Sequence, residues 1–161
     1  MDIRDQMDVG GSRYDTTRAM SDPSTRKRII NSLTPEKEVD VVVALETLGL
    51  PIGLLIAENC DAGFVPLREK NKIPASEKHL RSVDVPYDHR DKTLVVDARN
   101  LSDDQEVLLA DDWIESGEQI RSALNLVEPL CDEITAVSTI GTDTNEQYKF
   151  LEDYTVLEAI D

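Results

Sequence analysis

The sequence predicts an α/β fold in which a mainly parallel sheet is flanked by helices. Short apolar runs, several of them rich in β-branched residues, alternate along the chain with stretches of helical spacing, and such alternation is typical of parallel strands joined by right-handed crossovers. The apolar runs lack a polar residue at every second position, which indicates strands that are covered on both faces. The length of 161 residues suits one domain that buries its core without disulfides.

The first half of the chain begins irregularly and then alternates between helix and strand. Residues 1–20 are polar with little periodicity, so we expect a flexible N-terminal arm and a single domain over 21–161. Asp22 followed by Pro23 is a typical helix start, because the first offers a capping oxygen and the second needs no hydrogen-bond partner there. The expected elements are a helix from Pro23 with Ile29, Ile30 and Leu33 facing the core, a strand over 39–45, a buried helix over 51–59 and a strand over 63–67.

Residues 70–91 break this pattern, because charged residues, prolines and both histidines fall there without a visible period. A long irregular segment inside a compact domain is either functional or disordered. Beyond it the alternation resumes, and the spacing of apolar residues from Ile120 to Leu130 predicts a helix. The expected strands are an edge strand over 94–96, a buried strand over 107–110 and two more over 134–138 and 154–157.

The composition excludes several classes of partner. The formal net charge of −16 argues against nucleic-acid binding over the whole surface and against anionic membranes, so we expect neither partner. Cys60 and Cys131 lack the spacing of a zinc site, and we interpret them as buried thiols in a reducing cytoplasm. The N-terminus lacks the apolar core of a signal peptide, and the longest apolar stretch, 48–57, is too short to cross a bilayer. The expected location is the cytoplasm.

The segment 107–124, VLLADDWIESGEQIRSAL, carries the clearest chemistry. A buried strand ends at Asp111 and Asp112, a short loop with Ser116 and Gly117 follows, and a helix begins. Ligands of open α/β sheets bind at the carboxyl ends of strands, and the free N–H groups of a helix start bind phosphate. Carboxylates there can accept hydrogen bonds from sugar hydroxyls. The segment therefore predicts a site for a phosphorylated sugar, although solvated acids before an ordinary helix cap remain the alternative.

Three blocks of the sequence resemble the type I phosphoribosyltransferases, most closely the adenine-type purine enzymes. The acid pair and the loop after it resemble the family's acids followed by Thr-Gly-Gly-Thr. VVVALETLGLPIGLLIA (41–57) is similar to a strand, Gly-Ile-Glu-Ala-Arg-Gly-Phe and a helix, and GFVPLREKNKIP (63–74) is similar to Gly-Phe-Val-Pro-Val-Arg-Lys-x-Gly-Lys-Leu-Pro. The blocks occur in the family's order, and the resemblance covers roughly residues 22–160.

The resemblance implies a Mg²⁺-dependent glycosyltransferase of purine salvage that transfers phosphoribose from phosphoribosyl pyrophosphate (PRPP) to a purine base and releases pyrophosphate. It implies a homodimer, and Mg²⁺ held mainly through PRPP rather than by protein ligands. The base, adenine or a 6-oxopurine, is left open. The alternative is a sensor that binds PRPP or a nucleotide on the same fold without turnover.

The family's roles map onto this sequence residue by residue. Asp111 and Asp112 match the acids that bind the ribose hydroxyls, and residues 115–119 match the 5′-phosphate loop. Residues 75–91 match a mobile hood over the reacting centre, in which Tyr87 either packs or covers the ligand. The remaining assignments are Glu115, Ser116, Gly117, Glu118 and Gln119 in the 5′-phosphate loop, and Glu46, Thr47, Arg68, Lys70 and Lys72 at the pyrophosphate.

Several residues depart from the family pattern. Glu118 places a carboxylate beside a phosphate site, which is repulsive unless the side chain turns away. Leu48 stands where adenine enzymes have Arg. Glu115 stands where adenine enzymes have Ala and 6-oxopurine enzymes have an Asp that handles the purine N7 proton, so it is either the catalytic acid/base group or an exposed loop acid. Trp113 either stacks near the base or packs against the loop.

Overall fold

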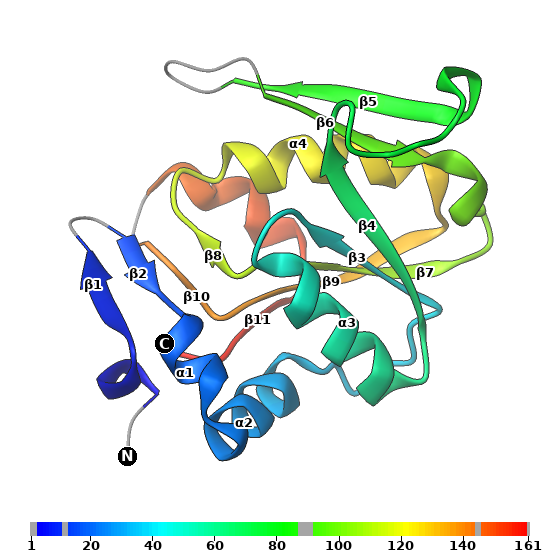
Figure 1. Ribbon diagram of the computed structural model, residues 1–161. Helices are drawn as coiled ribbons and strands as arrows, with labels where there is room; N and C mark the ends of the chain where they lie inside the picture. Colours follow the sequence, from blue (N-terminus) through cyan, green and yellow to red (C-terminus); the bar gives the residue numbers. More distant parts are fainter. Residues whose placement is uncertain (1–2, 11–12, 87–91, 144–145, 161) are drawn as a thin grey trace.

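A seven-stranded sheet forms the centre of the protein in the computed structural model, which describes residues 3–10, 13–86, 92–143 and 146–160 (Figure 1). Five neighbouring strands run parallel, and the last two continue the sheet antiparallel to them. The predicted fold class is therefore confirmed. In sheet order the strands are β11 (Val156–Glu158), β9 (Glu133–Thr139), β7 (Glu106–Ala110), β3 (Val41–Leu45), β4 (Gly63–Glu69), β6 (Lys92–Asp97) and β5 (Leu80–Val85).

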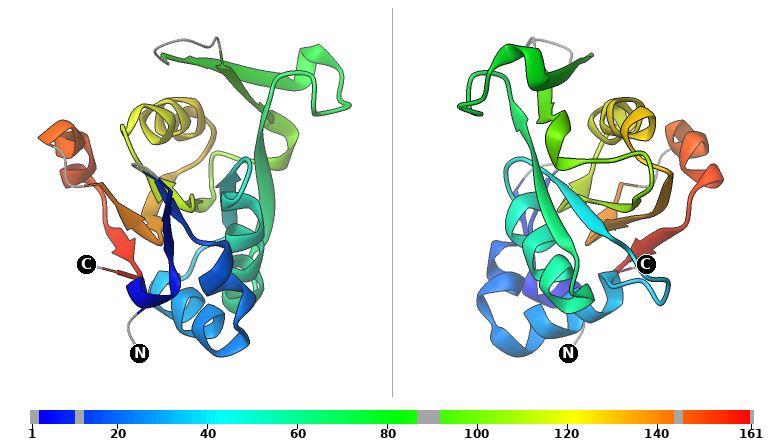
Figure 2. Two further views of the ribbon diagram at one scale, coloured as in Figure 1. Left: turned by 60° about the vertical axis from the view of Figure 1, so that its left-hand side comes forward. Right: turned by 90° about the vertical axis from the view of Figure 1, so that its right-hand side faces the viewer.

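Helices cover both faces of the parallel strands (Figures 1 and 2). α2 (Pro23–Leu33) and α3 (Gly49–Cys60) pack on one face, and α4 (Glu118–Val127) packs on the other. All five residues of β3 are buried, because alternate side chains enter the two apolar clusters on opposite faces of the sheet. The run of apolar residues that predicted a strand covered on both faces thus matches its environment.

The helix predicted from Pro23 is confirmed. Asp22 accepts a hydrogen bond from the N–H of Thr25 at 2.8 Å, and Ile29, Ile30 and Leu33 are buried. α3 is longer than the predicted helix and is not buried on every side, since the side chain of Leu54 is 53% exposed. Both cysteines are free and only half-buried, which differs from the prediction of buried thiols.

The described residues of the N-terminal segment form short regular elements, which the sequence did not indicate. These elements are the 3₁₀ turn η1 (Arg4–Gln6), the hairpin β1 (Asp8–Gly10) and β2 (Arg13–Asp15), and the helix α1 (Thr17–Ser21). Ile3, Met7 and Ala19 are buried in the cluster that also contains α2 and α3. These apolar residues are isolated along the chain, so no periodic pattern in the sequence predicts that they pack into the core.

The region expected to be irregular contains a strand. After the 3₁₀ turn η2 (Glu77–His79), β5 pairs antiparallel with β6 from Leu80 opposite Asp97 to Val85 opposite Lys92. The strand predicted over 94–96 is present within β6, but its predicted place at the edge is wrong, because β5 lies outside β6 and forms the edge. β5 and β6 together, called the hood hairpin below, lie beside α4 (Figure 1). Tyr87 and the rest of the predicted hood up to residue 91 lie outside the described residues.

Short elements complete the chain. The last predicted strand begins two residues later than expected, at Val156. Among the described residues, no helix combines the length and apolar character that crossing a membrane requires. The short elements are η3 (Ala98–Asn100), β8 (Trp113–Ile114), η4 (Glu128–Leu130), β10 (Gly141–Thr142), which pairs with β8, and the 3₁₀ helix η5 (Glu146–Asp153).

Candidate functional site

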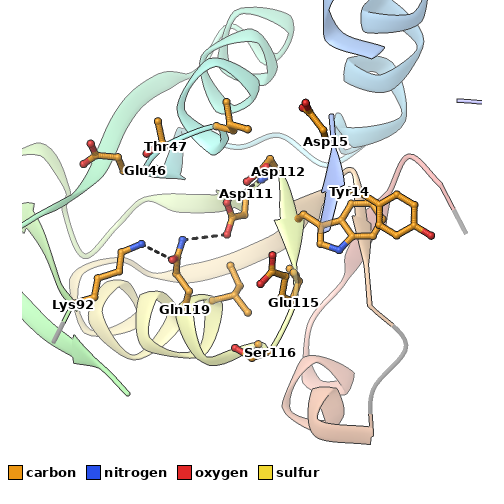
Figure 3. Close-up of a pocket in the computed structure, with 15 residues that line it drawn as sticks. Tyr14, Asp15, Glu46, Thr47, Lys92, Asp111, Asp112, Glu115, Ser116 and Gln119 are labelled. Atoms are coloured by element: carbon orange, nitrogen blue, oxygen red, sulfur yellow. Dashed lines mark hydrogen bonds between the residues drawn. The ribbon is translucent and has the colours of Figure 1, made fainter. Parts of the chain in front are cut away.

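A pocket of about 460 Å³ opens where β3 and β7 end (Figure 3). Its lining comes from β2, from the residues after β3, from the start of β6, from the segment between β7 and α4, and from the first turn of α4. The two strands are neighbours and run parallel, so their carboxyl ends meet at one edge of the sheet. The structure thus brings most of the residues selected from the sequence into one cavity.

Asp111 is the most deeply buried acid of the pocket, with only 4% of its surface exposed. Its Oδ1 accepts a hydrogen bond from the N–H of Asp112 at 2.9 Å. Burial, followed by the charge of Asp112, raises the pKa of Asp111 well above its ordinary value of 3.8. Gly49 allows this carboxylate to sit against α3, because a Cβ at that position would lie 3.0 Å from Oδ1. A buried oxygen with spare acceptor capacity suits a ligand hydroxyl.

Asp112 lies closer to the surface of the pocket. Burial, with a further contribution from the charge of Glu115, raises its pKa above the ordinary value, although hydrogen bonds from the side chain of Asp111 and the backbone act the other way. Its backbone carbonyl accepts a hydrogen bond at 3.1 Å from the N–H of Ile140, which lies between β9 and β10. Both predicted ribose acids therefore line the cavity, and both would gain from a ligand that hydrogen-bonds their oxygens.

The 5′-phosphate loop, residues 115–119, turns sharply at Gly117, whose φ of +78° is costly for any residue with a Cβ. The loop is braced from behind by η5. The hydroxyl of Tyr148 donates to the carbonyl of Ile114 at 3.0 Å and contacts that of Glu115, and its ring faces Gly117. Burial, followed by the charges of Asp143 and Glu115, raises the pKa of Tyr148 to about 12, so the hydroxyl keeps its proton and remains a donor.

Glu118 and Gln119, the two unusual residues of the loop, lie differently. Glu118 does not line the pocket; its carboxylate pairs with Arg121 at 3.6 Å in the first turn of α4. The repulsion of phosphate expected from the sequence is therefore reduced, because the acid turns away and complements the helix dipole instead. Gln119 does line the pocket, and its amide nitrogen lies 3.5 Å from Oδ2 of Asp111.

Glu46 and Thr47 line the pocket directly after β3, and the peptide bond between them is cis. The Glu46 side chain is 8% exposed. Burial alone would raise its pKa, but hydrogen bonds from Lys72, the backbone N–H of Glu69 and Arg68 outweigh it and hold the pKa of Glu46 below its ordinary value. Glu46 is thus a charged carboxylate at the wall of the cavity.

The three basic residues assigned to pyrophosphate do not line the pocket in this structure. Lys72 donates to Glu46 at 2.8 Å, and the Nε of Arg68 forms a 3.5 Å ion pair with the same carboxylate. Lys70 is exposed, and its backbone N–H donates to the carbonyl of Thr93. Arg68 and Lys72 are therefore engaged with Glu46, which itself lines the pocket.

Sequence reasoning missed three polar lining residues, Tyr14, Asp15 and Lys92. Tyr14 and Asp15 come from β2, which had no visible strand pattern, and Lys92 comes from the first position of β6. The Nζ of Lys92 donates to Oε1 of Gln119 at 2.6 Å, which continues to Asp111 (Figure 3). No local signal marks these residues, because only the pairing of strands far apart in sequence carries them to the cavity.

Trp113 forms one wall of the pocket. Its indole N–H donates to Asp143 at 2.9 Å, and one edge of the ring lies where a Cβ on Gly141 would be. Its face stacks on Tyr14 with ring centroids 4.5 Å apart and an angle of 28° between planes. Trp113 thus packs within the protein, as one of the two sequence interpretations held, while it remains at the cavity surface.

Comparison with known proteins gives the family. No family model matches the chain. The adenine phosphoribosyltransferase of Koribacter versatilis is 30% identical over 152 residues, 91% of this chain and 81% of that one. The enzyme of the same name from Clostridium tetani is 30% identical over 148 residues, 86% of this chain and 84% of that one. The solved adenine phosphoribosyltransferase of Rhodothermus marinus shares the fold, with a TM-score of 0.88 at 23% identity over 98% of this chain and 95% of that one. Because the similarity spans most of both chains, this chain belongs to the adenine phosphoribosyltransferases, within the type I phosphoribosyltransferase family.

Proposed function

We propose that the protein transfers the phosphoribosyl group of PRPP to adenine and releases pyrophosphate. The observation that carries this proposal is the pair of buried acids, Asp111 and Asp112, placed beside the 5′-phosphate loop in one pocket. This arrangement suits a ribose with a phosphate on one side. The relatives named above are adenine enzymes, which favours adenine over a 6-oxopurine and turnover over a sensor.

In the proposed complex the carboxylates accept hydrogen bonds from the ribose 2′- and 3′-hydroxyls. The N–H groups of the 5′-phosphate loop bind the 5′-phosphate, with Ser116 as a further donor and Gly117 permitting close approach. Glu46 and Thr47 lie at the pyrophosphate end. Arg68 and Lys72 neutralise Glu46, so that this carboxylate does not repel the leaving group. A direct contact of Lys70 with pyrophosphate stays a prediction.

The site suits a Mg²⁺ ion that binds together with the substrate. Among the described residues, no cluster of three His, Cys, Asp or Glu side chains could hold a metal. Asp111 and Asp112 supply oxygen atoms of the type that Mg²⁺ prefers, and this ion commonly binds through one or two carboxylates, waters and substrate phosphates. When bound, the ion neutralises charge on the phosphate oxygens.

Glu115 is our candidate for the catalytic acid/base group. As the base nitrogen bonds to C1′ of the ribose, the bond from C1′ to the pyrophosphate oxygen breaks and the base loses a proton. Glu115 lines the pocket and is half-buried, which supports the catalytic interpretation over that of an exposed loop acid. The hood over residues 75–91 would exclude water, which would otherwise capture the electron-poor ribose. Its mobility, like that of residues 1–20, remains a prediction.

The test of the function is pyrophosphate release from PRPP and Mg²⁺ with adenine, hypoxanthine, guanine and xanthine in separate reactions. We expect release with adenine. Release only with a 6-oxopurine would overturn the choice of base. Tight PRPP binding measured by calorimetry, without release for any base, would instead establish the sensor.

We also propose a homodimer. The resemblance to the family supports this proposal, and Leu54 on α3, which is 53% exposed, offers an apolar contact to a second copy. Light scattering at micromolar concentrations should give twice the chain's mass of 18.0 kDa. Monomer-sized particles at both physiological and high salt would refute this. The cytoplasmic location stays a prediction.

A further inference from the structure

Lys92 has an unusual position in the charge pattern of the pocket. Among the described lining residues, five are acids (Asp15, Glu46, Asp111, Asp112 and Glu115) and Lys92 alone carries a positive charge. PRPP would bring two further anionic groups, the 5′-phosphate and the pyrophosphate, into this cavity. Since like charges at short range disfavour binding, a fixed cation facing the cavity is needed to offset them.

The environment of Lys92 leaves its charge available to a ligand. Its short contact, 2.6 Å to Gln119, is with a neutral amide oxygen, and its ion pair with Glu69 is long, at 3.9 Å. Lys72, in contrast, contacts Glu46 at 2.8 Å and Glu69 at 3.1 Å. The Lys92 side chain is 21% exposed, so the surrounding protein covers most of it.

Gln119 gives Lys92 a defined orientation. Its amide oxygen accepts from Lys92, and its amide nitrogen lies 3.5 Å from Asp111, so one side chain connects the hood hairpin, the 5′-phosphate loop and a ribose acid (Figure 3). Thr is the residue that the family motif places at this position, and its side chain is too short to bridge both partners. Gln119 therefore serves to position the ammonium over the cavity.

We propose that Lys92 binds phosphate oxygens of PRPP and that Gln119 holds it in place for this. The proposal rests on the proposed function. It assigns the positive charge at the phosphate-binding surface to the first residue of β6, rather than to the basic run after β4, whose cations are engaged with Glu46. PRPP binding would then join the hood hairpin to α4 through an ionic contact.

The test compares two substitutions of Lys92 that separate charge from structure. Lys92→Gln can keep a hydrogen bond to Gln119 but loses the charge, while Lys92→Met loses both. A hydrogen bond to a charged group typically changes binding by roughly tenfold to a hundredfold, so both variants should bind PRPP with Mg²⁺ at least about tenfold more weakly in calorimetry. Lys92→Arg should retain most of the affinity, and Lys27→Gln, which removes an exposed charge on α2, should change nothing.

Two probes locate the contact. Ribose 5-phosphate and inorganic pyrophosphate are titrated separately into each variant, and the one whose affinity falls identifies the phosphate that Lys92 binds. Thermal unfolding of the ligand-free variants shows whether each is folded. If Lys92→Met is not folded, the affinities of Lys92→Gln decide the outcome.

Wild-type PRPP affinity in Lys92→Gln, with loss only in Lys92→Met, would overturn the proposal in favour of a structural role. If the wild type turns over adenine and the Lys92 variants match it in PRPP affinity, only this inference fails. If the wild type does not bind PRPP, the proposed function fails with it.

Discussion

Gly53→Ala tests how closely α3 approaches the sheet, which fixes the position of the pocket wall formed by the residues after β3. A Cβ built at Gly53 would lie 2.3 Å from the Cβ of Ala44 on β3, whereas ordinary contacts begin at 3.4 Å. It would also meet Ala110 and Phe64 at 3.5 Å. Because Ala44 and Ala110 are fully buried on rigid strands, α3 itself must move by about an ångström.

The expected effect is a net destabilisation. Overpacking a core typically costs about 1–3 kcal/mol, and a contact as close as 2.3 Å belongs in the upper half of this range, at about 2–3 kcal/mol. Replacing Gly by Ala inside a helix returns about 1 kcal/mol. The free energy of unfolding should therefore fall by about 1–2 kcal/mol, which lowers the melting temperature by roughly 2–8 °C for a chain of this size. Urea unfolding followed by circular dichroism measures this change. The displaced helix should also raise the KM for PRPP, since Glu46 and Thr47 precede it.

Gly63→Ala is the matched control, because its Cβ would meet Asp40 and Val41 at 3.4 Å, an ordinary contact. Its unfolding free energy should stay within about 0.5 kcal/mol of the wild type. A Gly53→Ala variant as stable as the wild type would refute the close packing of α3 on β3.

Four further predictions concern the pocket. Asp112→Asn should weaken PRPP binding by about 1–3 kcal/mol in calorimetry, and unchanged affinity would end its ribose assignment. Glu115→Gln should lower turnover of adenine by about 10²–10⁴-fold with PRPP affinity near normal; full activity would show a loop acid. Tyr148→Phe leaves two loop carbonyls without their donor and should raise the KM for PRPP about two- to tenfold, whereas an unchanged KM would mean that the loop needs no brace. The pKa of Asp111 is raised above 3.8 in the folded state, so the folded protein binds this proton more tightly than the unfolded chain does. The free energy of unfolding therefore falls as the pH rises from 3.8 towards the pKa of Asp111 in the folded protein. Asp111→Asn should therefore raise the melting temperature at pH 7 and flatten this decline, and an equal or lower melting temperature would contradict it.

The central sheet and its helices were predictable because their signals are local. Every residue of β3 is apolar, and the apolar residues of α4, from Ile120 to Val127, repeat at helical spacing and are buried. β5 was missed because few of its side chains are buried: Arg81 and Asp84 are exposed on opposite faces, and only Val85, at the end of the strand, is buried. A strand with few buried side chains and several charged ones lacks the continuous apolar run from which the other strands were predicted.

The site was predictable where the motif is continuous and not where it is assembled in space. Asp111, Asp112 and Gly117 follow one another along the chain, so one segment revealed them. Lys92 lies opposite Val85 in the hood hairpin and reaches the pocket through strand pairing that the sequence does not record. The sequence also does not show which way the Glu118 side chain points, and the structure defines this direction through its ion pair with Arg121.

The stack of Tyr14 on Trp113 gives the protein an intrinsic optical reporter. Trp113 is the single tryptophan of the chain, so all indole emission comes from the wall of this pocket. Indole fluorescence responds to nearby charge and to stacked rings, and a neighbouring tyrosine can transfer excitation to it. Arrival of a purine or a shift of the N-terminal hairpin would thus change the spectrum of the unlabelled protein, and stopped-flow fluorescence could time each event within a turnover.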